Sequence, residues 1–150
     1  MRQIFNTSND PSLLIARLIL GILFFAHGGQ KVFGWWGGLG FSGTMHFMTA
    51  VMHIPAVFAL LAICAEFLGG LGLIIGLLTR VAAFGVFVVM VVAIFLVSHK
   101  FGLFMNWGGQ QKGEGFEYHL LAIALAIVLM AKGAGALSID RGLGVRKRTR

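Results

Sequence analysis

Residues 56–98 read AVFALLAICAEFLGGLGLIIGLLTRVAAFGVFVVMVVAIFLVS, and this stretch decides the fold class. Its only charged residues are Glu66 and Arg80. A helix needs about 20 mostly apolar residues to cross a bilayer, so the stretch is long enough for two crossings joined by a short turn around Arg80. The sequence therefore predicts an all-α integral membrane protein.

The composition of the whole chain agrees with this class. Hydrophobic residues make up 58% of the 150 residues and charged residues only 11%, whereas soluble domains carry about 25% charged residues. The mean hydropathy is +0.90. The length suits a single membrane domain over residues 1–150. The one cysteine, Cys64, excludes an intrachain disulfide and a Cys-x-x-Cys redox pair.

Four apolar segments are predicted to cross the membrane as a helix bundle. Asp10 and Pro11 suit the N-cap and the first position of the first helix. The segments lie at residues 12–33, 56–79, 81–98 and 118–137.

The distribution of basic residues predicts the orientation of these spans. Five of the twelve basic residues lie in the last ten positions, residues 141–150, and Arg2 and Arg80 share their side of the membrane. The opposite loops, 34–55 and 99–117, contain two lysines. Both termini are therefore predicted to be cytoplasmic, with a basic cytoplasmic tail. Because the basic residues gather at the predicted cytoplasmic side, the net charge of +7 is explained by membrane topology, and nucleic acid is not a predicted partner. The same orientation puts all three tryptophans at the outer interface (Trp35, Trp36 and Trp107).

The first outer loop is predicted to contain a short interfacial or re-entrant helix that ends at Pro55. Apolar residues recur there at spacings of four, three and four, which places them on one helix face (Phe41, Met45, Met48 and Met52). The opposite face is polar (His46, Thr49 and His53). An irregular loop is the alternative.

Four glycines in the second span form a stripe for close helix packing, either within the bundle or between two copies (Gly69, Gly70, Gly72 and Gly76).

Glu66 is the first candidate for chemistry, because ionisable groups within membrane spans are costly. It lies about 15 Å from the outer end of its span at 1.5 Å per residue. His27 is its predicted partner and Arg17 the second choice. Such a carboxyl can exchange protons; the alternative is a hydrogen-bonded packing residue. Arg17 lies about 8 Å from the cytoplasmic end of its span, close enough to snorkel to the headgroups.

The five histidines all fall in the outer half of the bundle or in the outer loops. We expect an outer polar pocket above Glu66, formed by His27, Lys31, His99 and His119. Histidines gathered at one level suit a quinone headgroup, a metal or a haem. No His-x-x-x-His spacing is present, so no metal site is predicted. Interfacial histidines without a ligand are the alternative.

Several motifs, in this order and spacing, resemble the DoxX family of small four-helix bacterial membrane proteins. The first span contains Arg17, Leu20-Gly21, Phe24 and Gly28-x-x-Lys31. The second span contains Glu66-x-x-Gly69-Gly70-x-x-Leu73 and Gly76-x-x-Thr79-Arg80. The fourth span is followed by Gly133-Ala134-Gly135-x-x-Ser138-Ile139-Asp140. Ala134 stands where the family usually has proline. The resemblance implies that Arg17, Lys31 and Glu66 fill the family's polar positions and Asp140 its closing acid.

The family is named through subunits of a membrane thiosulfate:quinone oxidoreductase, so the resemblance implies redox work in the bacterial inner membrane. Three functions follow as hypotheses. The first is a quinone-linked redox subunit with a protein partner, in which Glu66 and His27 are catalytic and the quinone is bound by His27, Lys31, His99, His119 and Arg17. The second is a non-catalytic scaffold, or homo-oligomer, that assembles a redox or stress complex. The third is a small transporter or channel.

Overall fold

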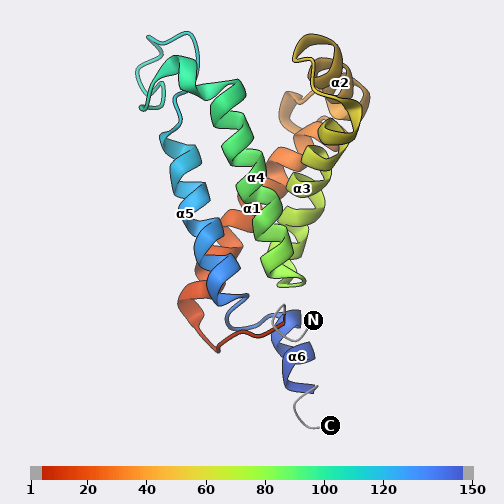
Figure 1. Cartoon of the computed structure of the whole chain (residues 1–150), viewed down its shortest axis with the longest axis vertical. Coiled ribbons are helices and arrows are strands. Elements are labelled where there is room, and N and C mark those ends of the chain that lie inside the picture. Colours follow the sequence, from red (N-terminus) through yellow and green to blue (C-terminus); the bar gives the residue numbers. More distant parts are fainter. Residues whose placement is uncertain (1–4, 147–150) are drawn as a thin grey trace.

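The computed structural model describes residues 5–146 of the chain, and within that range it is all helical, without a strand. Figure 1 shows the order of the helices. Short turns of other helix types lie at Trp35–Gly37, Phe47–Val51 and Ser98–Phe101. The α-helices are α1 (Pro11–Phe33), α2 (Gly40–His46), α3 (Ala56–Ile75), α4 (Thr79–Leu96), α5 (Glu117–Lys132) and α6 (Ile139–Arg146).

Three helices, α1, α3 and α4, are long and apolar enough to cross a membrane, which confirms three of the predicted spans. The fourth prediction, residues 118–137, is too long. Helix α5 has 16 residues and ends at Lys132, where Gly133 and Gly135 adopt left-handed φ angles of 88° and 76°. At 1.5 Å per residue α5 is about 24 Å long, against a hydrocarbon core of about 30 Å. The second span also ends early, at Ile75, because Gly76 caps α3 with a φ of 70°.

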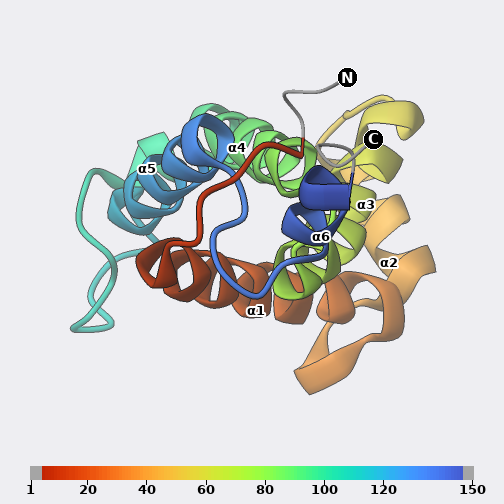
Figure 2. The same cartoon turned by 90° about the horizontal axis from the view of Figure 1, so that it is seen from below.

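The helices pack in the order α1 on α3, α3 on α4 and α4 on α5 (Figure 1). One end of the bundle, here called the base, carries α6 and both ends of the described part of the chain. The other end, here called the α2 end, carries α2 and the segment between α4 and α5. Seen from the base, the segment between α5 and α6 crosses the space between the helices (Figure 2).

The start of α1 follows the sequence prediction. Asp10 is the N-cap and Pro11 occupies the first turn. The Ser12 hydroxyl and backbone N–H donate to Asp10 Oδ1 at 2.6 and 2.8 Å, and these bonds hold the pKa of the Asp10 carboxyl below its usual value. The basic tail is only partly described: Arg141 donates to Asn9 Oδ1 at 2.7 Å, while Arg2, Lys147, Arg148 and Arg150 lie outside the described residues.

Glycines bring α1 and α3 into close contact, so the glycine stripe packs within the bundle. A Cβ added to Gly70 of α3 would overlap the backbone of Phe25 in α1. A Cβ added to Gly28 of α1 would overlap the backbone of Phe67 in α3. Dispersion contacts between closely spaced backbones are a principal attraction between helices in lipid. The close α1–α3 contact therefore fixes how the polar residues of the two helices lie relative to one another.

The segment between α1 and α3 is helical, as α2 and the π-helical turn Phe47–Val51, and its helical part ends before Pro55. Three methionines of the predicted apolar face are half-buried, and the two histidines of the opposite face are exposed (Met45, Met48, Met52; His46, His53). Thr44 is the buried residue of α2, and its hydroxyl donates to the carbonyl of Lys31 at 3.3 Å. This bond ties α2 to the last turn of α1.

Candidate functional site

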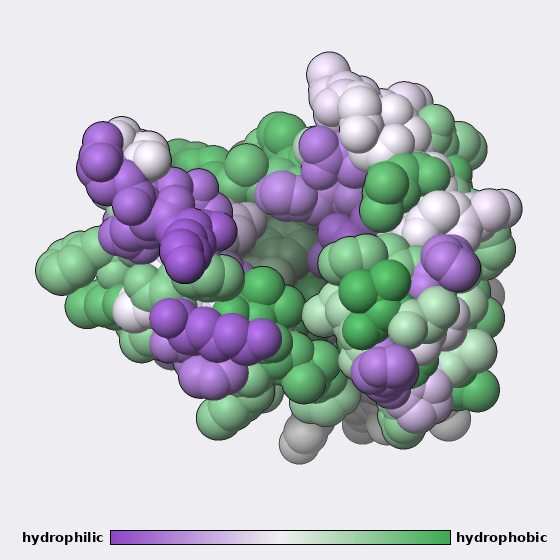
Figure 3. Space-filling view, turned by 90° about the horizontal axis from the view of Figure 1, so that it is seen from above, coloured by the Kyte–Doolittle hydropathy of each residue, from purple (hydrophilic) through white to green (hydrophobic). Residues whose placement is uncertain are grey.

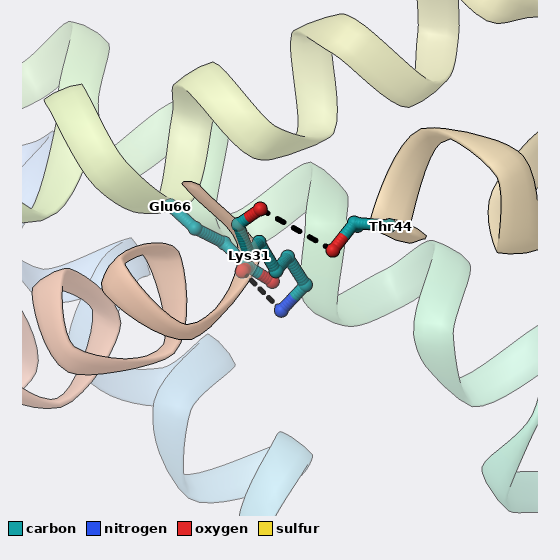
Figure 4. Close-up of polar contacts among 3 residues, drawn as sticks. All are labelled: Lys31, Thr44 and Glu66. Atoms are coloured by element: carbon teal, nitrogen blue, oxygen red, sulfur yellow. Dashed lines mark hydrogen bonds and ion pairs between the residues drawn. The ribbon is translucent and has the colours of Figure 1, made fainter. Parts of the chain in front are cut away.

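Glu66 occupies a core position of α3 and forms an ion pair with Lys31 of α1. The buried residues of α3 recur at spacings of four and three, and Glu66 is one of them, 5% exposed (Ala59, Ile63, Glu66, Gly70 and Leu73). The Lys31 ammonium reaches the Glu66 carboxylate from the last turn of α1 (Figure 4). A buried carboxylate is stable only when it is paired. The pair is neutral overall.

The predicted partners of Glu66 are therefore wrong. His27 and Lys31 lie one turn apart on the same side of α1, at 100° per residue. Lys31 starts one turn nearer the α2 end, but its long flexible side chain carries the ammonium to the carboxylate. Arg17 lies toward the base and has other partners.

Tyr118 of α5 belongs to the same site, although no sequence motif marks it. Its ring packs against the hydrophobic core, and its phenol lies within electrostatic range of the Glu66 carboxylate. The Tyr118 Oη atom is buried and has no hydrogen-bond partner within residues 5–146. A buried hydroxyl is normally paired, since an unmade hydrogen bond costs about 1–3 kcal/mol. The phenol is thus a donor that the described chain leaves unused.

His119 lies beside Tyr118 at the start of α5, with ring centroids 5.7 Å apart. Its Nε2 atom is 3.3 Å from the hydroxyl oxygen of Ser98, which is buried. Its Nδ1 atom is buried and lacks a partner in the described part of the chain. When the Ser98 hydroxyl donates to Nε2, the imidazole proton sits on Nδ1, because a neutral ring carries one N–H. His119 then offers a second unused donor.

His27 and His99 are both exposed, in different surroundings. The His27 ring lies 6.5 Å from the ring of Phe24, on the interior side of α1. His99 lies in the turn after α4, and its Nδ1 is 3.2 Å from the carbonyl of Ile94. The structure thus brings Lys31 together with Glu66 and His119 together with Tyr118, and it leaves His99 at the surface.

Arg17 does not snorkel to the headgroups. Its side chain is fully buried, and its guanidinium donates to five backbone carbonyls, those of Leu73, Ile74, Ala134, Ala136 and Leu137. These carbonyls belong to the end of α3 and to the turn after α5. A helix C-terminus carries partial negative charge on its unpaired carbonyls, which a cation stabilises. All five N–H groups of Arg17 are therefore used within the fold.

Asp140 and Arg80 complete the base in the same way. The Asp140 carboxylate accepts from the backbone N–H groups of Leu78 and Thr79, both at 2.8 Å, at the N-terminus of α4. Arg80 donates to the carbonyls of Met130 and Ala131 at the end of α5. A carboxylate thus lies at a helix N-terminus and guanidinium groups lie at helix C-termini, where each charge interacts favourably with the helix dipole. These contacts stabilise the base of the bundle.

No group of three or more His, Cys, Asp or Glu side chains within residues 5–146 is placed to hold a metal ion. Toward the α2 end, the described chain leaves the donors of Tyr118 and His119 unused and holds the ion pair of Lys31 with Glu66. At the base, Thr79 Oγ1 and Arg80 Nε are also buried without a hydrogen-bond partner among residues 5–146.

Comparison with known proteins identifies the family. A family model described as DoxX matches residues 12–99, which include the α1–α3 contact and the Lys31–Glu66 pair. The chain belongs to the DoxX family. The resemblance seen in the motifs is therefore confirmed.

Two curated relatives cover most of the DoxX chain. The chain is 32% identical over 132 residues to "Inner membrane protein YqjF" of Escherichia coli (strain K12), covering 88% of this chain and 92% of that protein. It is 28% identical over 135 residues to "Putative oxidoreductase CatD" of Bacillus subtilis (strain 168), covering 90% and 89%. No solved structure matches the chain significantly. The family and the apolar helices together show that this is a membrane protein.

Proposed function

We propose that this DoxX protein is a quinone-linked redox subunit of a bacterial inner membrane, acting with a partner. The observation that carries the proposal is the pair of unused buried donors on α5, Tyr118 Oη and His119 Nδ1, of which the Tyr118 phenol interacts electrostatically with the Glu66 carboxylate of the ion pair. The printed names of the two relatives, "Inner membrane protein YqjF" and "Putative oxidoreductase CatD", agree with it.

The donor set fits the headgroup of a quinone. A quinone has two carbonyl oxygens, which accept hydrogen bonds and need donors at the site. Tyr118 and His119 are such donors, and their rings offer an apolar surface for a flat headgroup. The surrounding core is apolar, as the site of a lipid-soluble molecule requires.

A bound quinone supplies reversible two-electron carbonyl chemistry that takes up and releases protons. Tyr118 and His119 bind and orient the headgroup. Glu66 and Lys31 hold and move the protons. Uptake of one proton neutralises the Glu66 carboxylate, and the positive charge then stays on the Lys31 side chain, which is 30% exposed and can be solvated. One cysteine gives the chain no internal disulfide couple, so a partner carries the electrons.

In the membrane we propose four crossings, with α5 as the fourth and α2 at the outer interface. Helix α5 packs beside α4, and both ends of the described part of the chain lie at the base (Figure 1). Lipids can adapt to a short helix by local thinning at modest cost. The base then faces the cytoplasm, as the basic residues of the sequence indicate.

Binding of a short-chain ubiquinone to purified protein in mild detergent tests the proposal. We expect His119→Leu to raise the Kd about tenfold, which corresponds to roughly 1.4 kcal/mol, the size of one lost hydrogen bond. His99→Leu is the matched control, because this exposed histidine lies at the same end, and its Kd stays within about twofold of the wild type.

Equal affinities of the two histidine variants would contradict the site. Wild-type protein that shows no saturable binding would contradict the function itself and favour the scaffold.

A further inference from the structure

Helix α1 shows that the interior of the bundle is sealed toward the base and open toward the α2 end. Residues 20, 24, 27 and 31 lie on one side of the helix at 100° per residue. Leu20 and Phe24 are each 1% exposed, whereas His27 is exposed and the Lys31 side chain is 30% exposed. The same face of one helix is therefore dry at one end and accessible at the other.

Helices α4 and α5 show the same gradient. Along α4, Val86 is 0% exposed and Met90 is 7% exposed, whereas Ala93, nearer the α2 end, is half-buried. Val97, the residue that follows α4 at the α2 end, is 40% exposed. Along α5, Ala126 is 0% exposed, while Tyr118 nearer the α2 end is half-buried. Figure 3, a view onto the α2 end, shows a hollow in this face with hydrophilic residues around it.

The base offers no comparable opening among residues 5–146. Arg17 and Thr79 are 0% exposed and Asp140 is 1% exposed. The turn at Gly133–Gly135 is buried as well and lies across the bundle (Figure 2). Below the site, apolar residues that are almost fully buried fill the interior (Leu20, Phe24, Leu73, Val86, Ala126 and Leu129).

We infer that the Lys31–Glu66 site exchanges its protons with the compartment at the α2 end and not with the compartment at the base. A proton that leaves the Glu66 carboxyl passes to water in the hollow. The titratable groups of α1 and α5 toward this end of the bundle include Lys31 and His27 from α1 and Tyr118 and His119 from α5. This inference rests on the proposed function, which requires protons to reach the site. The side from which the site is accessible can nevertheless be measured without a quinone.

Labelling of single cysteines by a small, membrane-impermeant methanethiosulfonate tests the path, in a Cys64→Ser background. The reagent is applied to opposite faces of membrane vesicles, and it reacts with thiolates, which form in water and not in lipid. His27→Cys and Val97→Cys report on the hollow. Lys100→Cys marks the α2 end, and Gly142→Cys marks the base, where an added Cβ meets nothing within 4 Å.

We expect His27→Cys and Val97→Cys to react from the side that labels Lys100→Cys, and to be protected from the side that labels Gly142→Cys. Ile22→Cys is the lipid-facing control on α1, 56% exposed on the opposite side of the helix, and it stays unlabelled. Labelling of either reporter from the Gly142 side, or labelling as slow as that of Ile22→Cys, would overturn the inference. A failure of quinone binding would leave these labelling rates unchanged, so the two proposals fail separately.

Discussion

Replacement of Arg17 by methionine is expected to lower the free energy of unfolding by about 3–5 kcal/mol, because it leaves several buried carbonyls without a hydrogen-bond donor. The guanidinium is fully buried and donates to five carbonyls, including those of Leu73 and Ile74 at the end of α3. Methionine fills much of the volume but donates no hydrogen bond, so the carbonyls lose their partner. Chemical or thermal unfolding of purified protein in mild detergent measures the change.

Lys132→Met is the matched control, because Lys132 is an exposed basic residue toward the same end of the bundle. We expect it to change the free energy of unfolding by less than about 0.5 kcal/mol. Arg17→Lys should lie between the two, since lysine keeps the charge and has three donors in place of five. An Arg17→Met protein as stable as Lys132→Met would show that the carbonyl contacts do not hold the base together.

The Lys31–Glu66 pair is expected to show a coupling energy of about 1–3 kcal/mol in a double-mutant cycle. Lys31→Met leaves the Glu66 carboxylate buried without its cation, so this variant loses stability. Adding Glu66→Gln removes the uncompensated charge and restores part of the loss. The expected coupling lies below that of a fully buried pair because the Lys31 side chain is 30% exposed and solvent screens it.

The cycle compares the unfolding free energies of the wild type, the two single variants and the double variant. Lys100→Met is the control, since it removes an exposed lysine at the same end. Additive effects of Lys31→Met and Glu66→Gln would mean that the two charges do not interact, and the assignment of the ion pair would fail.

The hydrophobic pattern predicted the helices well because a membrane span depends on length and apolar composition, which are local properties. The same pattern placed the end of the last span at residue 137, although α5 ends at Lys132. Gly133 and Gly135 were counted as part of an apolar run. Their left-handed φ angles depend on the turn packed against α1 and could not be inferred from hydropathy.

The candidate site was predicted in part. The depth of Glu66 followed from helix rise, but the choice between His27 and Lys31 depended on which side chain reaches across to α3. Arg17 was judged by its distance from the helix end, which assumes that nothing covers that end. In the structure the turn after α5 folds over it. Tyr118 was missed, although its position as the single tyrosine beside His119 was a usable signal.

Quinone content per protein, measured by mass spectrometry of an organic extract after purification in mild detergent, tests the central claim most directly. The account predicts close to one quinone per wild-type chain and per His99→Leu chain. It predicts that His119→Leu, which lacks a headgroup donor, loses most of its quinone, and that Glu66→Gln, which keeps both donors, retains it. Absence of quinone from the wild type, or equal retention in all four proteins, would contradict a quinone site built on Tyr118 and His119.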